Sequence, residues 1–163
     1  MEEINGSFQV DIERLHSLGV IDPNSIESLE IYRSGKLNSN ERLYFSLWGS
    51  KDLNSTMFDA KQKFMQKGDD ITSAYFIVSG TALSLDGRWV ERLGPGSIIG
   101  LAEGIIGIRS SKTIIAVSPI QARILPINKI IHVIPKLPSV IQKIIINLAN
   151  RSINLSSQPI NNG

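Results

Sequence analysis

The sequence predicts a mainly β sandwich with helices at both ends, and three observations support this fold class. Between residues 57 and 127 the apolar residues form short runs of strand length that are separated by turn residues. On both sides of this region the apolar residues recur at helical spacing. A chain of 163 residues has room for one ordinary core. We therefore expect an N-terminal helical extension (1–52), a β domain with a C-terminal helix (53–155) and a disordered tail (156–163).

Composition excludes several classes of protein. The 17 Lys and Arg residues against 15 Asp and Glu give a net charge of only +2, so a general nucleic-acid-binding surface has weak support. The chain has no cysteine, which excludes disulfides, thiolate metal sites and a cysteine nucleophile. The first residues carry acids where a signal peptide needs basic and apolar residues, and no run is apolar enough to span a bilayer. A cytoplasmic location is expected.

Three short helices are predicted before residue 50. In each one the apolar residues share a helical face, and a glycine follows as a stop signal. For the second helix, Asp22 supplies an N-cap and Pro23 a first-turn proline. The predicted helices span residues 7–18, 23–34 and 40–48.

The strand region contains seven short apolar runs. Asp86-Gly87 lies between two of them and is a strong hairpin signal, because such a turn needs positive φ at both central positions. Gly94-Pro95-Gly96 marks a second turn. The runs are MFDA, KFMQ, AYFIVSG, TALSL, RWVERL, TIIAVSP and QARILPI. Their lengths and separators are typical of an antiparallel sandwich or barrel.

After Ile127 the pattern returns to helix, with Pro135 and Pro138 on either side of a break. The final helix is expected over residues 139–153. One apolar stripe along it is predicted to pack against the protein; it consists of Ile141, Ile144, Ile145 and Leu148. Ile146 and Ile153 lie off this stripe. They predict a second apolar face, which favours a homodimer or a protein partner bound through this helix.

Four motifs in order resemble those of the cyclic-nucleotide-binding domain family, which includes the sensor domain of the catabolite activator protein and the regulatory subunits of protein kinase A. They are Lys67-Gly68-Asp69-Asp70, Tyr75-Phe76-Ile77-Val78-Ser79-Gly80, Leu93-Gly94-Pro95-Gly96 followed by Ile98-Ile99-Gly100, and Pro135 before residues 141–151. The resemblance covers residues 57–155. It implies a double-stranded β-helix, or jelly roll, with flanking helices.

The resemblance also places the phosphate-binding cassette, which would be residues 100–116. In such a site, backbone N–H groups at a helix start and an arginine hold the phosphate. The family's glutamate, which binds the ribose, would be Leu101, and the family's arginine falls on Ser110, with Arg109 one position early. The candidate ligand-binding residues are Gly100, Leu101, Ala102, Glu103, Arg109, Ser110 and Ser111. Lys112 is expected to face solvent.

Leu101 and Ser110 cannot replace the charged pair. Each charge-assisted hydrogen bond contributes about 1.5–3 kcal/mol, so losing both weakens binding by about a hundredfold or more. Arg109 would need a one-residue shift to reach the phosphate. Glu103 could substitute for the missing acid, or it could be an N-terminal helix acid favoured by the dipole.

These residues favour a non-catalytic regulatory module with a degenerate cassette that acts through protein–protein interaction. The alternative is a genuine sensor of cyclic AMP, cyclic GMP or another anionic small molecule, which signals by moving its C-terminal helix.

A metal-dependent enzyme is the third reading, but His16 and His132 are far apart and neither has a nearby ligand companion, so no metal site is predicted. No cofactor other than a cyclic nucleotide is implied. DNA binding in cis is not expected, because the helix-turn-helix of the family's transcription factors has no counterpart after residue 155.

Overall fold

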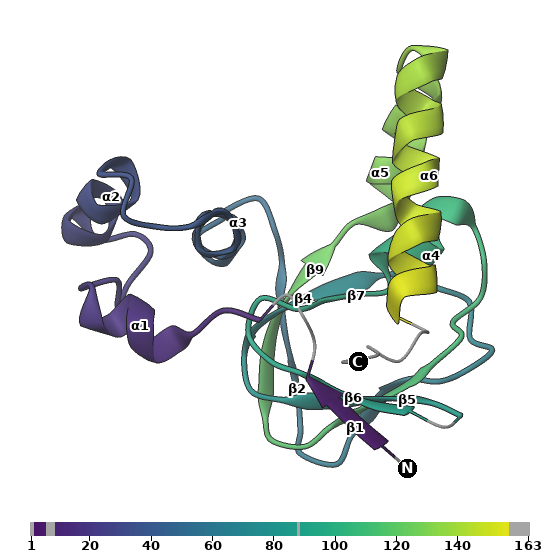
Figure 1. The fold of residues 1–163 in the computed structure, drawn as a ribbon, viewed down its shortest axis with the longest axis horizontal. Helices are drawn as coiled ribbons and strands as arrows, with labels where there is room; N and C mark the ends of the chain where they lie inside the picture. The colour runs from purple at the N-terminus through teal and green to yellow at the C-terminus, as the bar shows by residue number, and fades with distance from the viewer. Residues whose placement is uncertain (1, 6–8, 88, 157–163) are drawn as a thin grey trace, which may run out of the picture.

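The structure, a computed structural model, describes residues 2–5, 9–87 and 89–156. Nine strands lie in this part of the chain: β1 (Glu2–Asn5), β2 (Ser55–Phe58), β3 (Lys63–Met65), β4 (Ala74–Ser79), β5 (Ala82–Asp86), β6 (Trp89–Leu93), β7 (Ile98–Ile99), β8 (Thr113–Ala116) and β9 (Ile120–Leu125). The helices are α1 (Ile12–Ser17), α2 (Ile26–Arg33), α3 (Ser39–Trp48), α4 (Leu101–Ile106), α5 (Ile127–Val133), the 3-10 helix η1 (Ile134–Lys136) and α6 (Ser139–Ser156). Figure 1 shows them around a β sandwich.

The strands form two sheets with the orders β1-β6-β5-β8-β3 and β2-β9-β4-β7. All pairs are antiparallel except β1 with β6, which are parallel. One cluster of buried side chains draws on strands of both sheets, and we call it the interior core: Phe58, Met65, Ile77, Ala82, Leu93, Ile99, Ile114, Ala116, Ile120 and Ala122. The predicted mainly β fold with flanking helices is confirmed.

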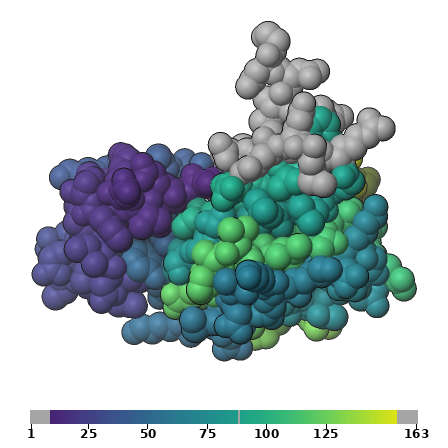
Figure 2. Space-filling model, turned by 90° about the horizontal axis from the view of Figure 1, so that it is seen from below, coloured from purple at the N-terminus to yellow at the C-terminus, as the bar shows by residue number. Residues whose placement is uncertain are grey.

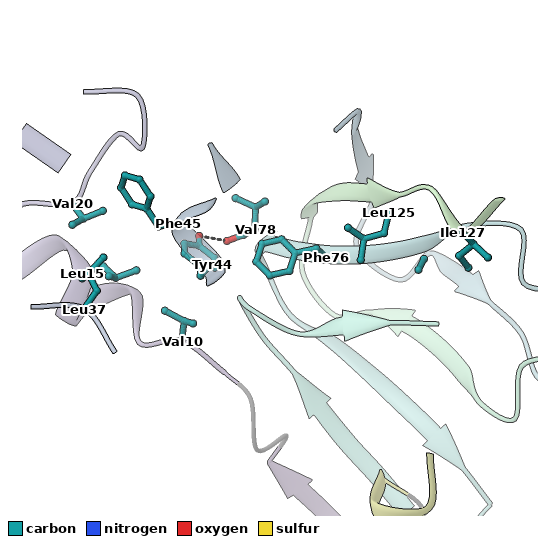
Figure 3. Close-up of a cluster of buried hydrophobic side chains, with 11 residues drawn as sticks. Val10, Leu15, Val20, Leu37, Tyr44, Phe45, Phe76, Val78, Leu125 and Ile127 are labelled. Atoms are coloured by element: carbon teal, nitrogen blue, oxygen red, sulfur yellow. Dashed lines mark hydrogen bonds between the residues drawn. The ribbon is translucent and has the colours of Figure 1, made fainter. Parts of the chain in front are cut away.

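A second buried cluster joins the N-terminal helices to β4, and we call it the helix-side core (Figure 3). Phe76 and Val78 on β4 belong to it, whereas Ile77 between them belongs to the interior core, as the alternation of a strand requires. Tyr44 of α3 packs its ring 5.6 Å from that of Phe76. Its hydroxyl donates a 2.7 Å hydrogen bond to the Val78 carbonyl, and burial raises the Tyr44 pKa. The helices form a lobe at one end of the molecule (Figure 2).

An ion pair holds α1 to α3. Arg14 donates to both carboxylate oxygens of Glu41, at 2.7 and 2.6 Å, and the Glu41 side chain is only 3% exposed. Glu41 also completes a capping box with Asn38, in which each side chain accepts the backbone N–H of the other residue at 2.9 Å. The carboxylate therefore has a hydrogen-bond donor on each oxygen.

The helix starts differ in part from the prediction. Helix α3 begins one residue before its predicted start. Helix α1 begins only at Ile12, after an Asp11 N-cap. Helix α2 begins at Ile26 with Ser25 as its N-cap. The Asp22 carboxylate instead accepts the Asn24 N–H at 2.9 Å, which holds a turn before the helix.

Among the strands, β1 and the two-residue β7 were not predicted, and β2 begins two residues before the MFDA run. Residues 9 and 10 lie along the edge of the first sheet. The Gln9 side chain donates to the Arg92 carbonyl at 2.6 Å, and the Val10 N–H donates to the Pro95 carbonyl at 2.9 Å. Gly94 leaves room for the Gln9 side chain, since a Cβ there would lie 3.0 Å from the side-chain oxygen Oε1 of Gln9.

Helix α6 stands out from the sandwich and contacts α4 near its C-terminal end (Figure 1). The predicted stripe is wrong in its direction, because Ile141, Ile144 and Leu148 are 41%, 49% and 59% exposed. Ala149 is buried and Ile153 half-buried, one turn apart, so the helix turns that side toward the protein. The predicted tail, apart from Ser156, lies outside the described residues. None of the described helices combines the length and the apolar character that crossing a bilayer requires.

Candidate functional site

The predicted cassette folds as a short helix, α4, between two left-handed glycines. Gly100, with φ of +81°, precedes the helix, and Gly107, with φ of +75°, ends it. Gly104 lets α4 approach the start of α5, because a Cβ at this position would lie 2.4 Å from Ile127 Cδ1. Gly104 therefore allows α4 to lie close against α5.

Leu101 begins α4 and packs against the helix-side core. Its side chain contributes to that cluster rather than to the interior core, so it does not fill the space between the two sheets. Ala102 and Glu103 follow on the same helix and are half-buried. The structure thus keeps these three residues together at the helix start but gives Leu101 a packing function.

Arg109 and Ser110 lie in contrasting environments. The Arg109 side chain is 73% exposed, and its Nε lies 3.2 Å from an oxygen of the equally exposed Asp70. Ser110 is buried, and its hydroxyl donates to the Lys112 carbonyl at 2.7 Å while accepting the Lys112 N–H at 3.3 Å. Ser111 is half-buried.

The backbone of Ser110 is equally engaged. Its N–H donates to the Asp69 carbonyl at 2.9 Å, and its carbonyl accepts the Gly68 N–H at 2.8 Å. These bonds tie the end of the cassette to the turn between β3 and β4. Ser110 therefore fastens two loops together, and its hydroxyl already has a donor and an acceptor.

The prediction that Lys112 faces solvent is wrong. Its side chain is only 11% exposed, and its Nζ lies 3.7 Å from Glu91 Oε2, on a side chain that is 21% exposed. A lysine this deeply buried needs charged or polar partners, because the ammonium loses most of its hydration. Glu91 on β6 supplies one of them.

Sheet register places Lys112 and Glu91 on the interior face. Ser84 on β5 is the register partner of Glu91 on β6 and of Ile114 on β8. Because Ile114 belongs to the interior core, this face points between the two sheets. Lys112 precedes Ile114 by two residues and reaches Glu91 across β5. We call Lys112, Glu91 and Ser84 the interior polar cluster.

Ser84 completes this cluster, and its hydroxyl is unusual because it is buried without a hydrogen-bond partner among the described residues. Its side chain is 2% exposed, and its oxygen has no hydrogen-bond partner among the described residues. Buried hydroxyls are almost always paired, so an unpaired one beside two opposite charges marks a polar site. Sequence reasoning missed all three residues, although the alternation of Lys112 with the apolar Ile114 and Ala116 was a usable signal.

Within residues 2–5, 9–87 and 89–156, no group of three or more His, Asp or Glu side chains is placed to hold a metal ion.

No protein-family model and no curated protein matches the sequence. Solved structures do match the fold. The EAL enzyme Bd1971, in a form bound to cAMP and cyclic-di-GMP, superposes with a TM-score of 0.54 at 22% identity, over 63% of this chain and 29% of that one. This chain therefore spans less than a third of the enzyme's length.

Two further structures match. A chain from work on a cyclic-GMP-dependent signalling pathway that regulates bacterial phytopathogenesis gives a TM-score of 0.53 at 19% identity, over 72% of this chain and 95% of that one. A regulatory protein from Silicibacter pomeroyi DSS-3, proposed to bind cAMP, gives 0.50 at 14% identity, over 64% and 50% of the two chains. The chain thus has the fold of cyclic-nucleotide-binding domains, as its motifs predicted.

Proposed function

We propose that this protein is a non-catalytic regulatory module of the cyclic-nucleotide-binding fold that does not bind cyclic AMP or cyclic GMP in the micromolar range and acts through protein contacts. The observation that carries this proposal is the burial and hydrogen bonding of Ser110. It stands where the resemblance expects the phosphate-binding arginine, and its hydroxyl is buried and bonded to the Lys112 backbone.

The other two cassette positions support the same function. Leu101, at the position of the ribose-binding acid, is partly buried and packs against the helix-side core. Arg109 is exposed and beside Asp70, where a solvated ion pair contributes little and a nearby carboxylate opposes an approaching phosphate. A cyclic nucleotide would therefore lose both of its charged contacts.

Titration calorimetry with cyclic AMP and with cyclic GMP tests this proposal. We expect no heat of binding up to about millimolar ligand, since the loss of two charge-assisted contacts weakens affinity about a hundredfold or more. A dissociation constant in the micromolar range for either nucleotide would overturn the proposal.

For the protein contact we propose a second copy of this chain, bound through the exposed face of α6. Val140, Ile144 and Leu148 recur at i, i+4 and i+8, and all three are exposed. Lys143, Asn147 and Arg151 border these residues in a shallow surface groove. An apolar stripe with a polar border is the pattern of a helix that pairs with another helix.

Sedimentation velocity tests the dimer. We expect a concentration-dependent dimer that Ile144→Lys and Leu148→Lys both disrupt, because each places a charge on the apolar stripe. Ile26→Lys is the matched control, since Ile26 is 73% exposed on α2 and its replacement should leave the dimer intact. A wild-type protein that is monomeric at every concentration would contradict the homodimer and leave a different protein as the partner.

A sensor function is the second candidate, and the exposure of Arg109 favours it. An anionic small molecule could bind the Arg109 guanidinium and the backbone amides at the start of α4, where Leu101 and Ala102 lie. Thermal shift against a nucleotide panel tests this candidate. Stabilisation by a nucleotide that Arg109→Ala abolishes would support it, and stabilisation that survives the substitution would exclude this site.

A further inference from the structure

We infer that the turn between α5 and α6 docks on an anionic lipid surface. We call this turn, residues 133–141, the apolar tip. Its aliphatic side chains enter the headgroup layer, and the lysines on and beside it lie against the lipid phosphates. This contact goes beyond the proposed function and shares only Val140 with the α6 stripe that we assign to the dimer.

The apolar tip lies at the end of α6 that points away from the sandwich (Figure 1). Ala149 is buried where this helix meets the protein, and the helix starts at Ser139. At about 1.5 Å per residue, that start lies about 15 Å beyond Ala149 along the helix axis. A protruding turn of this kind cannot enclose a small molecule, but it can enter a flat and deformable surface such as a headgroup layer.

The side chains of the apolar tip are mainly aliphatic and exposed. Val133, Val140 and Ile141 are 53%, 67% and 41% exposed. Pro135 and Pro138, which lie between them in the chain, are exposed as well. Exposed apolar residues that gather at one point mark an interaction site, whereas single ones are ordinary surface. Contact with a lipid layer would remove these side chains from water.

The backbone of the apolar tip is already hydrogen-bonded within the turn. The Gln142 side chain donates to the Pro135 and Leu137 carbonyls at 3.2 and 2.7 Å. The Leu137 N–H donates to the Ile134 carbonyl at 3.0 Å, and the Pro138 carbonyl accepts the Gln142 N–H at 3.1 Å. The two prolines have no N–H to satisfy. These polar groups can therefore leave water without losing a hydrogen bond, as insertion into a lipid interface requires.

The charges around the apolar tip are all positive. Glu103 is the last acidic residue of the chain, and residues 104–163 carry seven Lys and Arg residues. Three of these, Lys129, Lys136 and Lys143, are exposed on the elements that form or flank the tip. None of the three forms an ion pair within the described residues. Such a basic and apolar surface is complementary to a bilayer that carries anionic lipids.

Vesicle sedimentation with the full chain tests the charge of this contact. We expect wild type to pellet with phosphatidylcholine vesicles that contain about one quarter phosphatidylserine, and added salt to release it. Vesicles of pure phosphatidylcholine should not pellet it. Lys129→Glu/Lys136→Glu should weaken binding at least about twentyfold, since each lysine near an anionic surface contributes about fivefold. Lys36→Glu/Lys51→Glu is the matched control, because it changes the net charge equally on exposed lysines outside α5 and α6.

A second variant tests the apolar part of the contact. Val133→Ser/Ile141→Ser should weaken binding to the anionic vesicles at least about tenfold, because two aliphatic side chains no longer leave water. Ile26→Ser is its control, since Ile26 is 73% exposed on α2, far from the tip in the chain. Both controls should bind much as wild type does. Circular dichroism shows whether each variant is folded.

Wild type that stays in solution with the anionic vesicles would overturn the lipid contact and leave an acidic protein as the partner of these lysines. Binding that both tip variants retain would overturn it as well. Failure of the proposed function gives different results, namely micromolar binding of a cyclic nucleotide or a chain that is monomeric at every concentration. A monomeric chain that still pellets with anionic vesicles would contradict only the homodimer.

Discussion

Two carboxylate–cation pairs in this molecule are alike in charge but differ in geometry. Glu41 receives Arg14 at 2.6 and 2.7 Å and also accepts the Asn38 N–H, so both of its oxygens are satisfied. Glu91 lies 3.7 Å from Lys112, beside the unpaired Ser84 hydroxyl. The difference indicates that the first pair holds helices together, whereas the second occupies a polar space between sheets. Substitutions should therefore affect stability very differently in the two places.

The largest effect is expected for Glu41→Ala. It removes the capping box and both contacts of Arg14, so we expect the free energy of unfolding to fall by about 2–4 kcal/mol. Urea denaturation measures this loss. Glu41→Gln, which can keep the cap but not the charge, should lose less. Equal losses for the two variants would show that the capping box contributes nothing beyond the ion pair.

A smaller loss is expected for Ser110→Ala. Its hydroxyl bonds both the N–H and the carbonyl of Lys112, and removing it leaves both buried groups short of a partner. The expected cost is about 1–2 kcal/mol by urea denaturation. Ser111→Ala is the matched control, as the neighbouring half-buried serine, and should change stability less. A neutral Ser110→Ala would mean that the hydrogen bonds of this hydroxyl to Lys112 contribute nothing to stability.

The pair at Glu91 should behave in the opposite way to the pair at Glu41. Glu91→Met/Lys112→Met should change the free energy of unfolding by less than about 1 kcal/mol, or increase it, because well-packed apolar residues replace buried ions without loss. Denaturation of the double variant and of both single variants forms a complete cycle. A loss as large as that of Glu41→Ala would show that the two pairs are equivalent, against the comparison drawn here.

The smallest effect is expected for Arg109→Ala. Both side chains of its ion pair with Asp70 are exposed to solvent, and such pairs contribute about 0–1 kcal/mol to stability. We expect a change below about 0.5 kcal/mol that raised salt removes. A larger loss would place Arg109 in a structural network.

The fold was largely predictable because its signals are local. Short apolar runs, the Asp86-Gly87 turn and the cassette glycines each determine nearby backbone, and most strands lie within two residues of the runs that predict them. The two-residue β7 carries too little pattern to detect. The parallel pairing of β1 joins residues more than 80 positions apart, which no local signal encodes.

The candidate site was only partly predictable. Motif position singled out Leu101, which packs against the helix-side core, and Ser110, whose hydroxyl bonds the Lys112 backbone; their place in a ligand site stays a prediction. Lys112 was misjudged because a lysine in a loop is usually solvated, whereas its direction depends on the register of β8 with β5 and of β5 with β6. The outward face of α6 was missed for a similar reason. Four apolar residues on one side do not reveal which side meets α4.

The pairing of β1 with β6 has a consequence for colloidal behaviour. A sheet's outermost strand leaves N–H and C=O groups available to other chains, and such edges promote aggregation. Here β1 covers β6, and Gln9 and Val10 continue the cover as far as Pro95. The open edge of this sheet is therefore β1 itself, a strand of only four residues, and so short an edge limits pairing with other chains.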